Sequence, residues 1–396
     1  MLLYPAVYEK DRHTEAEDAL TREWSMTLAL IGHRSKVSPV GVDIGSSGVR
    51  AVQVASTDSA WRVTQMARVS IVDEKTDKPE SPASPLRRCL QQARFGGKAA
   101  YAAISPSDVE FHALELPKAL TEGGGGDVDQ VVRHEITRLM TQPEEGVETR
   151  HWSLPPTTVP APNAIGVAAG RKAIDTVMTT CEQAGLVCEN IETAAGALCR
   201  FGTALQARGD EEVWGLLDLG ERQARLVLCM GEAPILVRTI GDGGRSWTEL
   251  IAESLQISFG AAEVHKCDNG VASTVRGTGP GAPEEPSSRL ASMILGVLRS
   301  ELNKLATEIK RSYEYVLGCY PGRRASDLVL VGGGALMHNV AGFMTRALGI
   351  NVCGAGSFLG EETCRLKCTP SRRDPLELYA IATGLALGAE DVDVQV

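Results

Sequence analysis

The sequence predicts an α/β protein made of two related lobes, and three of its stretches carry that prediction. In residues 40–52, an apolar strand ends in Asp43, turns through small residues and returns as a second strand. In residues 213–230, Asp218 stands at the same place, and each acid is followed by a glycine two residues later and an arginine seven residues later. In residues 328–334, an apolar strand runs into three glycines. Two hairpins of one pattern indicate a duplicated fold with a ligand between its copies.

The residue types at the two turns suit a phosphate ligand with its metal ion. Glycine and serine let the backbone approach a ligand closely, and successive N–H groups of a turn can bind an anion. Asp43, at the mouth of its turn, can hold a water molecule of a hydrated Mg2+. Asp and Gly are also common in hairpin turns that bind nothing. We favour the metal and phosphate roles because Asp43 and Asp218 occupy equivalent places in a repeat.

The triglycine stretch favours a nucleotide for a related reason. Gly332, Gly333 and Gly334 leave no side chain to block access, and the N-terminus of the helix expected over 335–348 favours anions. A tight strand-to-helix turn without a ligand would use one or two glycines. Three in succession therefore favour a bound nucleotide.

Length and composition exclude several classes of protein. A chain of 396 residues exceeds one typical core, so two or more domains are expected. The net charge of −10 argues against a broad nucleic-acid surface. No apolar run reaches membrane-spanning length and no signal-peptide pattern opens the chain, so we expect a cytoplasmic protein. The ten cysteines form no CxxC pair, which predicts reduced thiols without a zinc site or a disulfide framework.

Hydrophobic periodicity places further elements in the first half of the chain. We expect strands at 61–71, 98–104, 105–117 and 164–168, helices at 86–90, 128–140, 171–184 and 193–205, and a flexible break at 123–126. Asp127 can cap the helix that follows the break, and Gly185 can end the helix over 171–184. The small residues of 193–205 would let that helix pack closely on a neighbour. We expect residues 1–38 to form a mobile N-terminal extension.

The second half repeats the alternation of strands and helices. We expect strands at 213–219, 224–230, 235–240 and 328–331, helices at 246–255 and 378–388, an exposed loop at 267–289 and a long helix from Leu290. The apolar stripe of the long helix is core. Residues 390–396 form an acidic tail.

In this order the segments resemble the actin-like ATPase superfamily and, within it, the PilM family of type IV pilus assembly. The stretches that carry the resemblance are Gly41–Ser47, Ala184–Leu186 with Ala197–Arg200, Ile257–Phe259 with Ala261–Glu263, Glu308–Ser312 and Val331–Ala335. The resemblance implies an actin-like (ribonuclease H-like) duplicated α/β fold. Its first lobe would span 39–210, with a small inserted α+β subdomain at about 105–185 like that of the cell-division protein FtsA. Its second lobe would span 211–396, with a subdomain at about 246–324.

The resemblance also implies ATP and Mg2+ in the cleft between the lobes. By that likeness the ligand is bound by Asp43, Gly45, Ser46 and Ser47 at the phosphates, by Asp218 and Gly220 from the other lobe, by Gly243 and Gly244 along the nucleotide, by Glu308 and Arg311 at the adenosine, and by Gly332, Gly333 and Gly334 beneath it. Asp43 and Asp218 would be the metal residues. Arg50 stands where the family usually has lysine, so a planar fork replaces a compact ammonium. The second turn also departs from the family.

That departure is Glu221-Arg222-Gln223, where the family usually has small hydroxylated residues. An acid beside phosphates is unfavourable unless it turns to solvent or binds the metal. Hydrolysis would need a polar group that orients water, and Glu192 and Gln223 are both candidates. At most weak ATPase activity is expected.

The function implied is a cytoplasmic, ATP-binding scaffold of type IV pilus assembly. It would close on Mg-ATP and bind the cytoplasmic N-terminal peptide of a PilN-like inner-membrane protein, so that it lies at the inner membrane through this and other pilus or secretion components. An FtsA-like filament protein is an alternative, although FtsA ends in a basic amphipathic helix and this chain ends in acids. A small-molecule kinase is less favoured, because no sugar-binding carboxylate set is recognisable between the hairpins.

Overall fold

The structure, a computed structural model, describes residues 37–57, 59–73, 78–117, 128–140, 146–271, 286–369, 371 and 374–388. Several sequence predictions lie outside these residues. They are the N-terminal extension up to residue 36, the break at 123–126 with its capping Asp127, most of the loop at 267–289, and the acidic tail.

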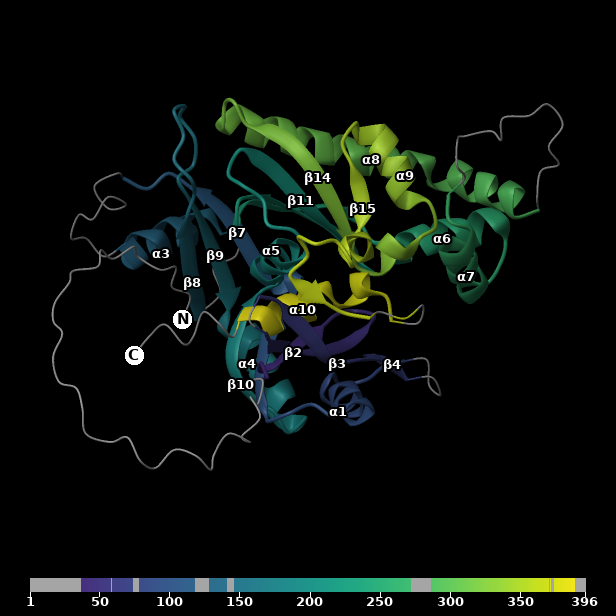
Figure 1. Ribbon diagram of the computed structural model, residues 1–396, viewed down its shortest axis with the longest axis horizontal. Coiled ribbons are helices and arrows are strands. Elements are labelled where there is room, and N and C mark those ends of the chain that lie inside the picture. The colour runs from purple at the N-terminus through teal and green to yellow at the C-terminus, as the bar shows by residue number, and fades with distance from the viewer. Residues whose placement is uncertain are drawn as a thin grey trace, which may run out of the picture.

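The first lobe is built on a six-stranded sheet, which lies in the lower half of Figure 1. Its strand order is β10-β6-β1-β2-β3-β16. The strands are β1 (Val40–Ile44), β2 (Gly48–Ser56), β3 (Trp61–Ser70), β6 (Ala99–Ile104), β10 (Val187–Thr193) and β16 (Leu366–Lys367). Helices α1 (Ala83–Gln92) and α4 (Arg171–Gln183) pack on it, and their Leu86, Cys89, Val177 and Cys181 join one core with Val40 and Val42. By these contacts α4 belongs to the first lobe, although the sequence placed 171–184 inside the insert.

The second lobe repeats the arrangement of the first. Its five-stranded sheet has the order β13-β12-β11-β14-β15. The strands are β11 (Glu212–Leu219), β12 (Gln223–Met230), β13 (Ala233–Asp242), β14 (Arg324–Val331) and β15 (Val352–Gly354). In each lobe the central strand pairs antiparallel with the next strand and parallel with a later one, so β3-β2-β1-β6-β10 and β13-β12-β11-β14-β15 match position by position. The structure therefore contains the duplicated fold that the two hairpins predict.

Helices α6 (Gly244–Leu255), α7 (Phe259–Asn269), α8 (Pro286–Cys319) and α9 (Val340–Leu348) accompany the second sheet. The apolar stripe of α8, including Ile294, Leu298, Leu302 and Ile309, is buried in the core of this lobe. The expected helix over 335–348 is interrupted: a 3-10 turn, η2 (Gly333–Leu336), precedes α9, and Asn339 between them has the left-handed φ of 63°. The other short elements are β4 (Val72–Asp73), β5 (Lys78–Pro79), η1 (Pro106–Asp108), η3 (Ala355–Phe358) and η4 (Leu376–Tyr379).

A small α+β unit is inserted between β6 and α4 and stands to the left in Figure 1. Its antiparallel sheet has the order β7-β9-β8, and helix α3 covers it. Its elements are β7 (Val109–Leu114), α3 (Val128–Leu139), β8 (Val147–Ser153) and β9 (Ala164–Gly170). Leu114, Val132, Ile136 and Ala164 form its own core, which makes the insert a separate packing unit.

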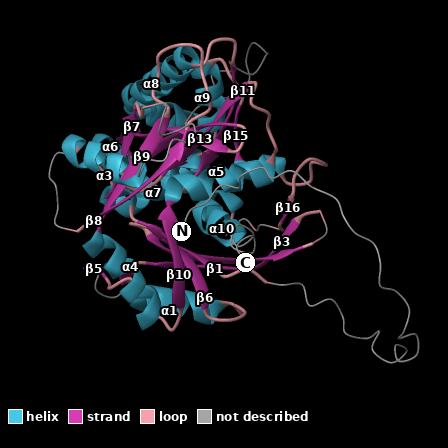
Figure 2. Ribbon diagram, turned by 90° about the vertical axis from the view of Figure 1, so that its left-hand side faces the viewer, coloured by secondary structure: helices cyan, strands magenta, loops and turns pink. Residues whose placement is uncertain are grey.

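Two helices made of small residues lie between the lobes, as Figures 1 and 2 show for α5 (Ala194–Leu205) and α10 (Ala380–Leu387). Their backbones approach so closely that a Cβ on Gly384 would lie 1.9 Å from the carbonyl oxygen of Ala197. On the other side of α10, a Cβ on Gly41 of β1 would lie 2.0 Å from the carbonyl oxygen of Ala382. Glycine at these places lets both helices cross at the junction of the lobes. In the part of the chain that the structure describes, no helix combines the length and apolar character needed to cross a bilayer.

Candidate functional site: two facing hairpin turns

Each hairpin turn is stabilised by a cross-strand pair of an aspartate and an arginine. In the first, Asp43 of β1 faces Arg50 of β2, with Nη1 3.2 Å from Oδ2. In the second, Asp218 of β11 faces Arg225 of β12, with Nη1 3.5 Å from Oδ2. The register of the ladders explains the spacing of seven residues, because the aspartate and the arginine of each pair stand directly opposite each other on the two strands that the tight turn joins. The same charged pair thus occurs at the same place in both lobes.

The structure brings the two turns together, since each aspartate is influenced by charges of the opposite hairpin. Burial raises the pKa of Asp43, and the guanidinium groups of Arg50 and then Arg225 partly oppose this rise. Burial also raises the pKa of Asp218, opposed by Arg225, while the negative charge of Asp43 raises it further. Two buried carboxylates that repel each other form a site that favours a cation between them.

Several polar groups at the turns make no hydrogen bond within the protein. Arg50 Nε, Arg225 Nη1 and Glu221 Oε2 are buried and make no hydrogen bond, although Arg225 forms its ion pair. The turns are closed by Gly45 N–H to the carbonyl of Gly48 and by Gly220 N–H to that of Gln223, at 3.0 and 3.1 Å. The N–H groups between these residues, at 46, 47, 221 and 222, donate none of the described backbone hydrogen bonds. The buried Arg50 Nε and the N–H groups of the turns can donate to an anionic ligand, whereas the buried Glu221 carboxylate oxygen does not favour one.

Arg50 is directed toward its own hairpin. Its Nη1 donates to Asp43, and its Nη2 donates to the Ser47 hydroxyl at 3.0 Å. Gly45 makes room for this guanidinium, because a Cβ there would lie 2.9 Å from Nη1. Arg50 therefore orients Asp43 and Ser47 from the side.

The triglycine turn packs on the second hairpin. Gly332 has a φ of +82°, and a Cβ on it would lie 2.6 Å from Asp218 Oδ1. A Cβ on Gly334 would lie 2.8 Å from the Cβ of Leu219, whereas a Cβ on Gly333 would meet nothing within 4 Å. Gly332 and Gly334 are thus required by close packing next to Asp218, and Gly333 faces open space.

Gly243 and Gly244 join the N-terminus of α6 to the second turn. The N–H groups of Gly243, Gly244 and Arg245 donate to the carbonyls of Arg222, Gly220 and Glu221 at 2.9, 2.9 and 2.8 Å. A side chain at Gly243 is excluded, because its Cβ would lie 2.4 Å from the Glu221 oxygen. The helix N-terminus therefore caps the carbonyl side of the turn.

Glu221 turns its Oε1 toward Arg245, whose Nη1 is 3.4 Å away. Among the described residues, no three His, Cys, Asp or Glu side chains gather in a way that could hold a metal ion. Glu221 is therefore directed to Arg245, and the metal role expected of Asp43 and Asp218 stays a prediction.

A buried lysine beside this turn was not predicted from the sequence. Lys266 of α7 is 4% exposed, and its Nζ donates to the Gly244 carbonyl at 2.8 Å, Thr248 Oγ1 at 2.6 Å and Glu263 Oε2 at 2.7 Å. Burial raises the pKa of Glu263, but hydrogen bonds from Lys266 and Thr248 outweigh it and hold the pKa below its usual value. The only local signal was the spacing of Glu263 and Lys266 by three residues, which places both on one face if the segment is helical, and Lys266 lies just beyond the stretch that carries the resemblance.

The structure does not join Glu308 and Arg311 to the glycine turns. Both line a cavity of about 750 Å³ between β13, α6 and α8, whose described lining includes Asp242 and Trp247 but no residue of either hairpin turn or of 332–334. Arg311 donates to Glu308 at 2.6 Å, and Arg238 of β13 lies 3.5 Å from the same carboxylate. Their predicted contact with adenosine stays a prediction.

The two candidates for orienting water lie in different surroundings. Glu192, at 5% exposure, forms a two-point ion pair with Arg200, with contacts of 3.0 and 2.7 Å. Arg200 also donates to the Gly384 carbonyl, which links Glu192 to the helix crossing. Gln223 is exposed at the start of β12. Glu192 is therefore engaged in a structural pair.

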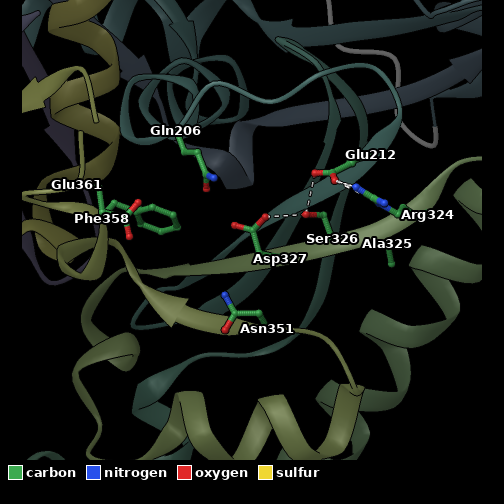
Figure 3. A pocket seen from close by; sticks show the side chains of 9 residues that line it. All are labelled: Gln206, Glu212, Arg324, Ala325, Ser326, Asp327, Asn351, Phe358 and Glu361. Carbon is green, nitrogen blue, oxygen red and sulfur yellow. Dashed lines mark hydrogen bonds and ion pairs between the residues drawn. The ribbon is translucent and has the colours of Figure 1, made fainter. Parts of the chain in front are cut away.

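A second cavity, of about 510 Å³, lies at the opposite end of the second sheet (Figure 3). It is lined by Glu212 and Arg324, which begin β11 and β14, while Asp218 and Val331 stand at the other ends of these strands. Asp327 in its wall is held from inside by Arg208, with Nη2 2.5 Å from Oδ2, and Arg208 lies 4.4 Å above the Trp214 ring. Four of its polar residues, Glu212, Arg324, Ser326 and Asp327, are paired with one another, as the dashed lines of Figure 3 show.

The duplicated sheets, the two small-residue helices and the paired hairpins define the actin-like fold. A solved structure described as a PilM–PilN type IV pilus biogenesis complex matches 89% of this chain and 98% of its own, with a TM-score of 0.67 and 24% identity. Residues 41–276 match the family model "Type IV pilus assembly protein PilM", and the chain belongs to this family.

Weaker structural matches include the ethanolamine utilization protein EutJ from Carboxydothermus hydrogenoformans and MreB5 of Spiroplasma citri bound to ADP. EutJ has a TM-score of 0.48 and 16% identity, covering 89% of both chains. MreB5 has a TM-score of 0.44 and 11% identity, covering 89% of this chain and 96% of its own. No curated protein matches the chain. The family and the fold expected from the sequence are confirmed.

Proposed function

We propose that the chain binds a magnesium nucleotide between its two hairpin turns and serves type IV pilus assembly as a nucleotide-gated scaffold. The resemblance to the family favours ATP as the nucleotide. The observation that carries the proposal is a matching Asp–Arg pair in the hairpin of each lobe, close enough for the charges of one hairpin to act on the aspartate of the other. The buried Arg50 Nε and the N–H groups of both turns that donate none of the described backbone hydrogen bonds supply donors for phosphate oxygens. Membership of a pilus assembly family independently supports the part of the proposal that concerns pilus assembly.

The carboxylates fit Mg2+ better than a metal that requires a full set of protein ligands. Mg2+ commonly keeps several waters and binds through one or two carboxylates together with substrate phosphates. Asp43 and Asp218 provide that number, and the cation would remove the repulsion that raises the pKa of Asp218. When bound, the metal ion would supply positive charge to the carboxylates of both lobes. Gly332 keeps Asp218 accessible, while Gly243, Gly244 and Lys266 hold the second turn in place.

The partner we propose is a PilN-like inner-membrane protein, bound through its cytoplasmic N-terminal peptide on the inserted subdomain. The matched structure is described as a complex of PilM with PilN, and the family assignment covers the insert. An extended peptide can pair with a sheet edge and place side chains in neighbouring pockets. The protein would then be cytoplasmic and held at the inner membrane by its partner. Because Glu192 is paired with Arg200, we propose that nucleotide binding, and at most slow hydrolysis, serves this role.

Calorimetry with Mg-ATP tests the nucleotide site. We expect Asp43→Asn to lower the affinity at least about 100-fold, because it removes the carboxylate charge proposed to hold the hydrated metal ion, while Arg50 keeps its hydrogen bond to Ser47. Asp175→Asn, an exposed acid on α4, is the matched control and should bind as the wild type does. Retained affinity in Asp43→Asn would refute the site. Pull-down with the partner's N-terminal peptide tests the scaffold, and failure with folded protein would remove that role.

A further inference from the structure

The inserted subdomain reaches across to the second lobe through residues 152–163, here called the arm. Trp152 of β8 donates from Nε1 to the carbonyl of Pro234, the second residue of β13, at 2.8 Å. Thr157 donates from Oγ1 to the carbonyl of Cys319, the last residue of α8. Leu154 packs against the core of the second lobe. The arm thus contacts two different elements of that lobe.

The arm is held firmly in the insert at both ends. Leu154 N–H donates to the Asn163 carbonyl at 2.8 Å, and the Asn163 side chain makes two hydrogen bonds to the backbone of Leu116, at 2.8 and 2.7 Å. The Trp152 ring packs edge-on against Phe111 of β7, with centroids 6.3 Å apart. Four prolines, at 155, 156, 160 and 162, restrict the backbone between these anchors. A stiff arm anchored in this way moves with the insert as one piece.

Strand β13 leads from the arm directly to the paired turns. It begins next to Trp152, pairs with β12 from Ala233 to Asp242, and ends one residue before Gly243. Gly243 donates to Arg222 in the second turn, and β12 carries Arg225. The cross-strand bonds along β12 and β13 make this a continuous packed path from Pro234 to the phosphate turn.

We propose that the arm couples occupancy of the hairpin site to the orientation of the inserted subdomain, and hence to its affinity for a partner peptide. This inference rests on the proposed function. When a ligand draws the hairpins together, the lobes rotate about the crossing of α5 and α10, and the second lobe carries the arm with it. The first lobe holds the other end of the insert through β6 and α4, so the insert turns relative to the first sheet. Trp152 and Thr157 are the residues that transmit the rotation.

Calorimetry on the full chain tests the coupling. The probes are Mg2+ with a non-hydrolysable ATP analogue and a synthetic peptide with the cytoplasmic N-terminal sequence of the PilN-like protein. The coupling is the ratio of peptide affinities with and without the analogue, and linkage requires the same ratio for the analogue with and without peptide. We expect a ratio of at least about fivefold in the wild type. Thr157→Val removes one hydrogen bond at nearly constant volume, and Trp152→Phe removes one hydrogen bond and keeps an aromatic ring, although a smaller one, against Phe111. Each should lower the ratio by up to about fivefold.

The matched control is Thr137→Val, because Thr137 lies on α3 of the same insert and donates only within its own helix. It should keep the wild-type coupling. Both arm variants should keep the affinity of each ligand measured alone within about twofold, which shows that the sites themselves are intact. An unchanged coupling in both arm variants overturns the inference and leaves the proposed function standing. A wild type that binds both ligands without coupling overturns the inference and the nucleotide gating, and leaves nucleotide binding and peptide binding as separate properties. A wild type that binds no analogue overturns the proposed function itself.

Discussion

The crossing of α5 and α10 makes a sharp prediction about Gly384. In Gly384→Ala the new Cβ would lie 1.9 Å from the Ala197 oxygen and 2.5 Å from its carbonyl carbon. Non-bonded carbon and oxygen atoms need roughly 3.5 Å, so the helices must separate by about 1.5 Å. Both clashing atoms are backbone, and no side-chain rotation can relieve them. Overpacking of this kind costs about 1–3 kcal/mol, and here we expect the upper end because α10 is also wedged against Gly41.

Denaturant and thermal unfolding of the full chain measure this cost. For a chain of this size, 1 kcal/mol corresponds to about 1–2 °C in Tm, so we expect a fall of about 3–6 °C. The matched control is Gly296→Ala in α8, where a Cβ meets nothing within 4 Å. That substitution should raise stability by about 0.5–1 kcal/mol, because alanine is the better helix former. If Gly384→Ala is as stable as the wild type, or is stabilised as the control is, the close crossing of the helices is refuted.

Three further predictions concern the site. Gly332→Ala should destabilise the fold by about 2 kcal/mol or more and abolish nucleotide binding, because φ is +82° and the Cβ would press on Asp218. Gly333→Ala is the control, and its free energy of unfolding should stay within about 0.5 kcal/mol of the wild type. Equal effects of the two substitutions in unfolding experiments would contradict the assigned packing. Lys266→Met should cost about 1–3 kcal/mol at neutral pH. Since the pKa of Glu263 is held low, the stabilisation that the ionised Glu263 contributes is present above its usual pKa and lost as pH falls through its folded pKa. A pH series of Tm should show this acid loss in the wild type and a smaller one in the variant, where only the Thr248 and Cys267 hydrogen bonds remain. Asp218→Asn should abolish metal-nucleotide binding and lower Tm without ligand at neutral pH, because it leaves the buried Arg225 guanidinium without its charged partner. A variant at least as stable as the wild type in thermal unfolding at pH 7 would contradict the assigned pairing.

The sequence was sufficient for the parts of the fold that rest on local pattern. Alternating apolar residues ending in an acid and glycine predicted both hairpins, and the seven-residue spacing of Asp43 and Arg50 is a direct result of their register. Helix α7 was not predicted, because its apolar residues do not gather on one face and its capping Ser258 opens no recognisable stripe. The break before α9 depends on the left-handed Asn339, which only the surrounding packing determines.

The residues of the candidate site likewise divide into those that local sequence pattern predicts and those that depend on the tertiary structure. Asp43, Asp218 and the three glycines of 332–334 follow from strand ends, and the structure places them together. Glu308 was assigned through resemblance alone; it lines the cavity between β13, α6 and α8 and is paired with Arg238 and Arg311, so its contact with adenosine stays a prediction. Lys266 could not be inferred as a support of the second turn, because its contact with Gly244 joins helices whose mutual orientation is set by the tertiary structure.

The first lobe has its own hairpin at the start of the chain, yet two of its components are made last. Helix α10 packs on β1 and β2, and β16 extends the sheet by pairing with β3. During synthesis on the ribosome, residues 40–56 therefore wait for a segment more than three hundred positions downstream before their apolar surface is covered. The second lobe, contiguous from 211 to 354, can assemble while the earlier sheet is still incomplete. Premature termination shortly before residue 380 would thus harm the beginning of the protein more than its middle.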